Sequence, residues 1–188
     1  ARSIKDLIAL VKAKPGSINY GSTGTGGITH LATELFDLMA GTKMTHVPYK
    51  GTGAALNDLL GGHVQIMFGA MPAMVPQHKS GRLRGLGVTT GKRNGALPDV
   101  PTIGETVKGY EAILWYGIWG PKKLPKEVVT RINSEVAKAV QLPDVRERMA
   151  GEGLEIAGGP PEQLTEVLRR EVPKWQRVVK DANVKAVQ

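Results

Sequence analysis

Apolar positions follow two alternating patterns over residues 1–90. Short apolar runs predict strands, and stretches with apolar residues three or four positions apart predict amphipathic helices. The expected strands lie at about 18–22, 44–49, 64–68 and 83–89, and the expected helices at about 3–14, 28–41, 51–62 and 70–81. A strand, a small-residue turn and a helix thus follow one another three times, which is typical of an α/β fold with a mainly parallel sheet. In such a sheet the strand-to-helix turns gather at one edge, where ligands bind.

The pattern of apolar, charged and glycine residues changes after residue 90. A long loop is expected over 90–110 and an apolar strand over 112–120. Beyond it charged residues become denser and glycines rarer, and the expected elements are helices at about 125–140, 143–150 and 161–181, with a short strand at 154–158. We therefore divide the chain into an α/β domain, 1–118, and a mainly helical part, 119–188.

Composition narrows the classes of function. The chain has 188 residues, no cysteine and a formal net charge of +8. Disulfides and thiolate chemistry are therefore excluded. Because the lysines and arginines are spread along the chain without interleaved aromatics, we expect no nucleic-acid partner, but the positive field favours small anions. The first 14 residues read as an amphipathic helix rather than a signal peptide, so an exported protein would appear here in processed or truncated form.

The stretch YGSTGTGGITH at residues 20–30 is similar to three known motifs that bind phosphate or carry a nucleophile, but it meets the residue requirements of none of them. A Walker A loop needs a lysine after its second glycine, and Gly27 stands there. The dinucleotide fingerprint needs glycine or alanine where Thr29 stands, and a nucleophile elbow needs glycine where Tyr20 stands. What remains is a helix N-terminus whose unpaired N–H groups, with nearby hydroxyls, suit a carboxylate. The alternative of a tight βα turn without a ligand stays open at this point.

Other candidate sites are weaker. His30 and Glu34 lie one helical turn apart, a spacing that suits two metal ligands, but a surface pair is the simpler prediction. No Ser-His-Asp set stands out. Trp115 and Trp119 would share one face of the expected strand 112–120 and are predicted to be core residues, although a tryptophan beside a cleft also covers ligands.

Four segments carry a resemblance to a known family: INYGSTGTGGITHLATELFDLMAG, HVPYKGTGAALNDLLGGHVQIMF, GRLRGLGVTTGKRNGALPDVPTIGE and WYGIWGPKKLPKEVVTRINSEV. In this order they resemble the tripartite tricarboxylate transporter receptors, the Bug family of periplasmic solute-binding proteins, over essentially the whole chain. The resemblance implies a type II periplasmic-binding-protein fold of two α/β lobes that close on a small organic carboxylate. It implies delivery of that ligand to membrane permease subunits, no catalysis and no cofactor. The spacing of the four histidines gives no reason to expect a metal site.

The resemblance also implies a set of ligand-binding residues in the three turns. These are Ser22, Thr23, Gly24, Thr25, Gly26 and Gly27 in the first turn, Tyr49, Gly51 and Thr52 in the second, and Gly69 and Ala70 in the third. Family members often carry Asp-Asn at the third turn, where the acid meets a ligand amino group. Gly69-Ala70 at that place favours a plain carboxylate over an amino acid.

Family members are longer than this chain and begin with a strand and a proline-glycine loop of the other lobe. The resemblance therefore implies that 1–118 is a complete second lobe and 119–188 an incomplete, C-terminal portion of the first. An incomplete lobe would expose apolar surface, so we expect a homodimer, or a swapped or rearranged C-terminal segment. Because half of the cleft would be missing, we also expect weak ligand affinity. Two alternatives remain: an enzyme that binds a phosphorylated substrate at the glycine loop, and an effector-binding domain of a regulator.

Overall fold

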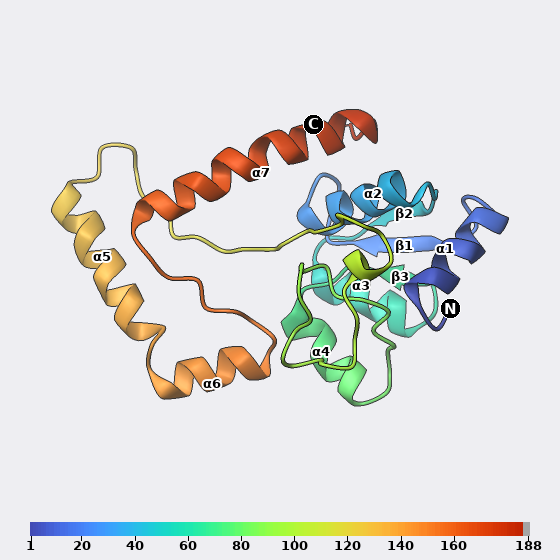
Figure 1. The fold of residues 1–188 in the computed structure, drawn as a ribbon, viewed down its shortest axis with the longest axis horizontal. Helices are drawn as coiled ribbons and strands as arrows, with labels where there is room; N and C mark the ends of the chain where they lie inside the picture. The colour runs from blue at the N-terminus through green and yellow to red at the C-terminus, as the bar shows by residue number, and fades with distance from the viewer. Residues whose placement is uncertain (186–188) are drawn as a thin grey trace.

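A computed structural model describes residues 1–185 of the chain. Its elements in order are α1 (Ile4–Ala13), β1 (Asn19–Ser22), α2 (Ile28–Ala40), β2 (Thr45–Pro48), α3 (Thr52–Leu60), β3 (Ile66–Met67), α4 (Met71–Lys79), the 3₁₀ turn η1 (Ile103–Glu105), α5 (Lys126–Ala139), α6 (Pro143–Gly151) and α7 (Pro161–Asp181). Figure 1 shows a body that contains all three strands, from which α5 and α6 stand away. No helix among residues 1–185 is both long and apolar enough to cross a bilayer.

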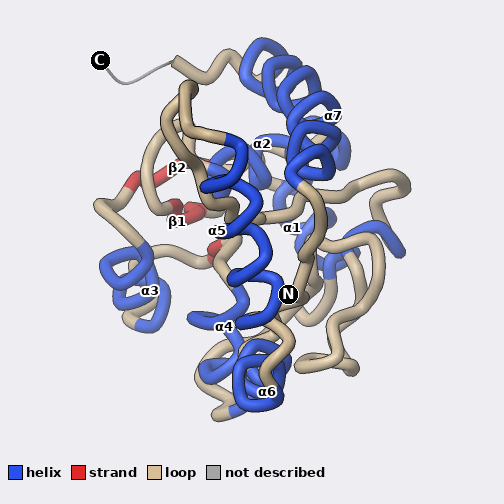
Figure 2. The backbone as a smooth tube through the Cα atoms, turned by 90° about the vertical axis from the view of Figure 1, so that its left-hand side faces the viewer, coloured by secondary structure: helices blue, strands red, loops and turns tan. Residues whose placement is uncertain are grey.

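The three strands form one parallel sheet, which confirms the α/β prediction. The strand order is β2-β1-β3, so the first strand in the chain lies in the middle. Tyr20 of β1 pairs with His46 on one side and with Ile66 on the other. In Figure 2 the strands lie among helices and loops, with β2, whose two end residues are exposed, toward the outside of the molecule. Because all three strands run the same way, the turns that follow them lie at one edge of the sheet.

Local capping explains where the first helices begin and end. The hydroxyl of Ser3 accepts the Asp6 N–H, as the sequence predicts, and the Asp6 carboxylate in turn accepts the Arg2 N–H. At the C-terminal end of α2, Gly41 has φ +62°, the left-handed conformation that glycine adopts without strain. These signals are local in the chain, so sequence reasoning locates these ends well.

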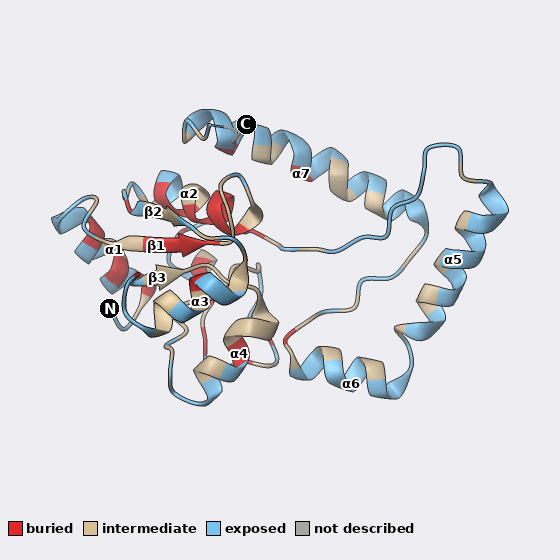
Figure 3. Ribbon diagram, turned by 180° about the vertical axis from the view of Figure 1, so that it is seen from behind, coloured by how far each residue is buried: buried red, intermediate tan, exposed pale blue. Residues whose placement is uncertain are grey.

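The main core lies between α1, α2 and the segment 103–112. Tyr20 and Phe36 are fully buried in it, and Val11 of α1 contributes from the other side. The hydroxyl of Tyr110 donates to the Ala32 carbonyl over 2.9 Å, so the polar end of this buried ring is satisfied. The buried residues, red in Figure 3, gather around β1 and the inner face of α2. This core fixes α2, and with it the glycine loop at its N-terminus.

Three expected strands do not form. Residues 83–89 make only a single parallel bridge, Val88 to Thr102, residues 112–120 run as extended chain, and 154–158 is irregular. A strand needs a neighbour whose backbone groups it can pair with. Val88 finds its partners in the following loop instead, accepting from Ile103 and donating to Pro101. Beyond Ala112, whose N–H bonds to Thr89, the extended segment has no ladder partner among residues 1–185.

The long loop 90–110 is nevertheless well held. Thr102 caps η1 in a complete capping box with Glu105, whose carboxylate also accepts two hydrogen bonds of 2.9 Å from the Arg93 guanidinium. The guanidinium holds the pKa of Glu105 well below its usual range, at about 2. Val100 of this loop packs with Val88 in a second, smaller core cluster.

The segment that carries α5 and α6 extends from the body as an arm and does not form a compact lobe. Neither α5 nor α6 has a fully buried residue, and both are pale in Figure 3. The arm returns to the body where the Asn94 side-chain amide donates to the Gly153 carbonyl over 2.9 Å. It then continues into α7, which packs on α2.

Candidate functional site

Three helices begin at the carboxyl edge of the sheet. The residues that precede their first turns are Gly27 for α2, Gly51 for α3 and Ala70 for α4, and none receives a side-chain cap. The edge therefore collects unpaired N–H groups and the positive ends of three helix dipoles. Figure 3 shows the arrow of β1 pointing to this edge, on the side where the arm lies. Such an edge favours an anion.

Much of the glycine loop is engaged by the protein's own atoms, which corrects the sequence-based picture. The N–H groups of Thr23, Gly24, Gly26 and Gly27 donate, respectively, to Thr29 Oγ1, Ser22 Oγ, His30 Nδ1 and the Gly24 carbonyl. Ser22 is fully buried, and its hydroxyl contacts His46 Nε2 at 2.6 Å. Ser22 therefore supports the loop from beneath and is not accessible to a ligand. Each of these groups already has a partner, because a tight loop buries the polar atoms on its inner side.

Three amides near the start of α2 have no hydrogen-bond partner, although one of them belongs to Thr29, which is only 7% exposed. The N–H groups of Thr25, Ile28 and Thr29 have no acceptor within residues 1–185. Ile28 and Thr29 are the first two helical positions, where a helix leaves its N–H groups unpaired. The anion-binding capacity of the loop is thus narrower than the sequence suggests and lies at these three positions.

The second turn adjoins the first. A Cβ atom placed on Gly24 would lie 3.8 Å from the Tyr49 carbonyl oxygen. The Tyr49 ring packs over Gly21, where a Cβ would approach it to 3.3 Å, and its hydroxyl donates to Asp58 over 2.7 Å. That hydrogen bond raises the pKa of Tyr49. Tyr49 is therefore held in place by α3, while Gly51, with φ +106°, opens the uncapped turn into Thr52.

The third turn lies at the same edge but contributes little chemistry. Gly69 and Ala70 follow β3 and lead into α4, whose first turn contains Pro72 as the sequence predicts. A Cβ on Gly69 would meet the Met74 side chain at 2.8 Å, so this position has no room for a larger residue unless Met74 moves. The turn thus presents backbone rather than a charged side chain.

An apolar groove of about 590 Å³ adjoins the first turn of α2. Ile28 and Leu31 of α2 form one wall, and the other walls come from 113–115 and α7. Its one acidic member is Glu171, which lies 3.2 Å from Arg170 and 3.8 Å from Lys174. The groove therefore offers an apolar surface to which Ile28, one of the residues with an unpaired N–H, contributes.

A polar cluster beneath the loop was not foreseen. His30 is only 5% exposed, which corrects the prediction of a surface pair with Glu34. Its ring stacks on His46 with centroids 3.8 Å apart and planes 6° apart, and Tyr20 stacks on His46 at 5.0 Å. The Tyr20 hydroxyl donates to Glu34 Oε1 over 2.5 Å, and His30 Nε2 lies 3.5 Å from the same oxygen. The sequence could have indicated this cluster only through Tyr20 and His46, which lie opposite each other on neighbouring strands. That placement is known only once the register of the two strands is known.

Burial and close contact shift the titration of this cluster. Burial, and then the neighbouring His30, lower the pKa of His46 to about 4. Burial raises the pKa of Glu34, but the hydrogen bonds from His30 and Tyr20 outweigh that effect and the pKa lies below its usual value. Burial and Glu34 raise the pKa of Tyr20. The cluster therefore combines a neutral His46 with an ionised carboxylate at neutral pH.

The tryptophans differ from expectation, and no metal site emerges. Trp119 is 62% exposed, so its prediction as a core residue is wrong, because the strand that was to carry it does not form. Trp115 is half-buried and lines the groove. Within residues 1–185, no three histidine, aspartate or glutamate side chains come together as metal ligands.

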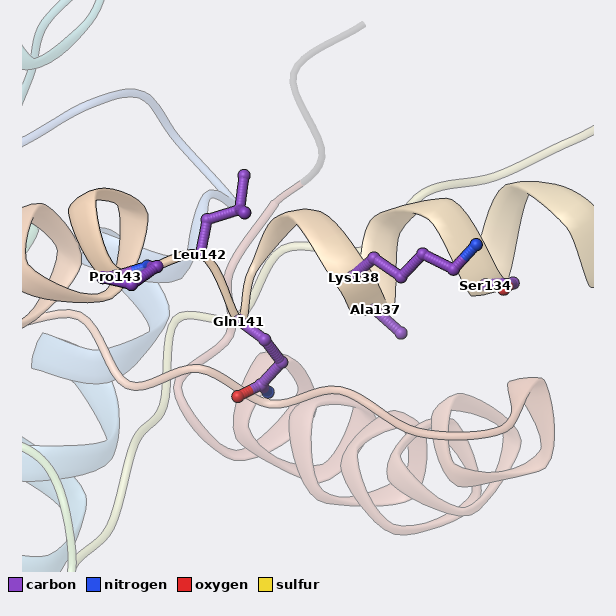
Figure 4. A pocket seen from close by; sticks show the side chains of 6 residues that line it. All are labelled: Ser134, Ala137, Lys138, Gln141, Leu142 and Pro143. Atoms are coloured by element: carbon purple, nitrogen blue, oxygen red, sulfur yellow. The ribbon is translucent and has the colours of Figure 1, made fainter.

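A second hollow, of about 510 Å³, lies along α5 and the turn into α6. Figure 4 shows that its side chains, among them Lys138, Gln141 and Leu142, point in different directions and do not converge. Lys138 pairs with Glu135 on its own helix. This hollow has no constellation that would orient a ligand, and we assign it no function.

Comparison with known proteins gives a consistent result. Residues 1–184 match the family model "Tripartite tricarboxylate transporter family receptor". The chain is 36% identical, over 189 aligned positions, to the "UPF0065 protein in tcbD-tcbE intergenic region" of Pseudomonas sp. strain P51, covering 100% of this chain and 56% of that protein. The chain thus spans little more than half the length of this relative.

Solved structures share the fold. "R. palustris Rpa4515 with adipate" superposes with a TM-score of 0.92 at 35% identity, covering 100% of this chain and 63% of that one. The periplasmic binding protein BugD gives 0.88 at 34% identity, with 98% and 63% covered. MatC (Rpa3494) from Rhodopseudomonas palustris with bound malate gives 0.80 at 26% identity, with 95% and 62% covered.

Proposed function

Because the chain belongs to the tripartite tricarboxylate transporter receptor family, we propose that it is part of a solute-binding receptor that captures a small organic carboxylate. The observation that carries the proposal is the edge where α2, α3 and α4 begin without side-chain caps. Unpaired N–H groups and helix dipoles at that edge stabilise a carboxylate without any catalytic group. The candidate contacts are the amides of Thr25, Ile28 and Thr29, with Gly51, Thr52, Gly69 and Ala70 at the neighbouring turns.

The apolar groove bears on the kind of acid. Ile28 belongs both to the set of free amides and to the groove wall, so a ligand that places a carboxylate at the amide lays its carbon skeleton on apolar side chains. The neighbours with bound adipate and malate carry dicarboxylates. The third turn, Gly69-Ala70, has no acidic side chain to receive an amino group. We therefore propose a plain dicarboxylate rather than an amino acid.

The partners follow from the family. A receptor of a tripartite tricarboxylate transporter acts in the periplasm and delivers its ligand to membrane permease subunits, and we propose both for this protein. We also propose that this chain associates with itself through the exposed apolar side chains of Tyr116, Ile118 and Trp119, which are 79%, 66% and 62% exposed. Adjacent apolar side chains of that size favour association in water.

The test is a titration of the chain with a panel of anions, followed by NMR because this method measures weak binding. The panel contains adipate, malate, aspartate and glycerol phosphate. We expect adipate and malate to shift the amide signals of Thr25, Ile28 and Thr29, and aspartate and the phosphate ester to bind more weakly. Tighter binding of the phosphate ester would support a phosphate-handling site instead, and no response to any acid would contradict the proposal.

A further inference from the structure

We propose that His30 is a positioning residue for the ligand loop 22–27: its ring holds the Gly26 amide inward and leaves the neighbouring amides to the ligand. The inference rests on the proposed function, which it deepens by naming the group that shapes the site. His30 itself is only 5% exposed. It acts through the backbone of Gly26, which is exposed at the tip of the loop.

The first step is the hydrogen bond between the loop and the ring. The Gly26 N–H donates to His30 Nδ1 over 3.0 Å. Because an N–H can only donate, Nδ1 carries no proton. The proton of the neutral ring then lies on Nε2, which faces Glu34 Oε1 at 3.5 Å. The same carboxylate oxygen accepts from the Tyr20 hydroxyl. The tautomer that serves the loop is thus favoured from the opposite side of the ring.

The second step is that the ring cannot easily turn away. His30 lies in parallel contact with His46, whose own Nε2 contacts the Ser22 hydroxyl at 2.6 Å. Ser22 in turn accepts the Gly24 N–H. His46 comes from β2, Ser22 from β1 and His30 from α2, so three elements hold the ring and the first part of the loop together. A group locked by packing and hydrogen bonds is what a precise binding site requires.

The third step is that the tip of the loop depends on this ring. Within the described part of the chain, His30 is the only side chain that hydrogen-bonds to residues 25–27. The backbone bonds to these residues all involve Gly27: its N–H donates to the Gly24 carbonyl over 3.3 Å, and its carbonyl accepts from the His30 and Leu31 N–H groups over 3.0 Å. Gly26 has φ +78°, and a Cβ there would meet nothing within 4 Å, so neither packing nor a side chain of its own fixes it. Without the ring, ligand binding would have to order the tip, which costs affinity.

The experiment compares two substitutions that separate the ring from its acceptor. His30→Phe keeps an aromatic ring on His46 but removes the acceptor, whereas His30→Asn keeps an acceptor at the position of Nδ1 and removes the ring. The readouts are hydrogen exchange of the Gly26 amide and adipate affinity, both by NMR on the full chain. We expect about tenfold faster exchange and about fivefold to tenfold weaker binding in His30→Phe, with both largely retained in His30→Asn. A merely structural role predicts that the two variants fail alike.

A third variant covers the case in which His30→Phe does not fold. His30→Gln carries its acceptor one bond farther from the backbone, so it should behave like His30→Phe while matching His30→Asn in polarity. Unchanged Gly26 exchange in the folded variants that lack the acceptor would overturn the inference, whether or not adipate binds. If the unsubstituted chain binds no acid at all, the proposed function fails, and the exchange data still decide whether His30 holds the loop.

Discussion

Ile28 occupies the first position of α2, and its backbone N–H has no acceptor within the helix. The preceding residue, Gly27, has φ −72° and ψ 164°, which is the conformation that a residue before proline prefers. A proline at position 28 is therefore compatible with the backbone and removes only an N–H that α2 does not use. This position allows the contribution of one amide to be measured without breaking the helix.

We expect Ile28→Pro to bind adipate about tenfold more weakly than Ile28→Ala, because a hydrogen bond to a charged acceptor contributes about 1.5 kcal/mol or more. Ile28→Ala is the matched control, since it loses the same apolar side chain from the groove but keeps the N–H. NMR titration gives the two affinities and circular dichroism the helix content. Equal affinity of the two variants would show that this amide does not contact the ligand.

At the scale of single residues, the sequence predicted the glycine loop but not which of its backbone amides bond to the protein itself. The lack of side chains at Gly24 and Gly26 is visible in the sequence and indicates a close approach of some partner. Which amides face the protein depends on where His30 and Thr29 point, and that follows only from the fixed start of α2. The burial of Ser22 was not foreseen for the same reason, because burial of a hydroxyl by a neighbouring strand is not a local property.

The pairing of β1 with β2 sets up the histidine cluster. Opposite residues Tyr20 and His46 stack with ring centroids 5.0 Å apart, and His30 of α2 covers His46 from the other side. The His46 ring is partly buried and has a pKa of about 4, whereas an unfolded histidine has a pKa of about 6.5. Between these values the unfolded chain binds more protons than the folded one, so acid favours unfolding.

We therefore expect the free energy of unfolding to fall as the pH drops from about 6.5 to 4, by about 1 kcal/mol from His46 once its partial exposure to solvent is allowed for. Urea denaturation at several pH values measures the slope. His46→Gln should flatten it, because glutamine does not titrate. His63→Gln is the control, since His63 is exposed and lies outside the cluster. Identical slopes in both variants would contradict this assignment.

The presence of a strand was predictable from the sequence only where the chain also contains the strand with which it pairs, whereas every expected helix could form by itself. The strands near 18–22, 44–49 and 64–68 formed because each has a neighbour in the sheet, and all seven expected helices formed. Residues 83–89 and 112–120 have the same apolar character but pair with no strand among residues 1–185, so their pattern alone was misleading. Strand formation depends on a partner, whereas a helix satisfies its own backbone.

The whole molecule is a body with an arm. The chain leaves the body in the extended segment that follows Ala112, the last core residue before the change in composition near residue 118. The helices α5 and α6 beyond it have no buried residues and stand away from the body (Figure 1). The division at 118 remains a prediction, because α7 returns and packs on α2. Sequence pattern gives the helices and their apolar faces, yet it does not say which surface covers each face.

Self-association is the prediction that belongs to this scale. Tyr116, Ile118 and Trp119 lie next to each other in the extended segment and are largely exposed. We expect sedimentation equilibrium to give a mass that rises with concentration toward that of a dimer, and the double substitution Ile118→Ser with Trp119→Ser to abolish the rise. Leu10→Ser is the control, because Leu10 is 49% exposed on α1, away from this segment. A monomer at all concentrations would rule out the proposed dimer.

The strand order β2-β1-β3 has a consequence for how the chain folds during synthesis. The middle strand is made first, and its two edges stay open until Thr45–Pro48 and then Ile66–Met67 have emerged. The sheet therefore depends on contacts between residues distant in sequence, which slows folding relative to a bundle of neighbouring helices. During that delay the backbone groups of β1 are unpaired, so this short strand can pair with a strand of another chain.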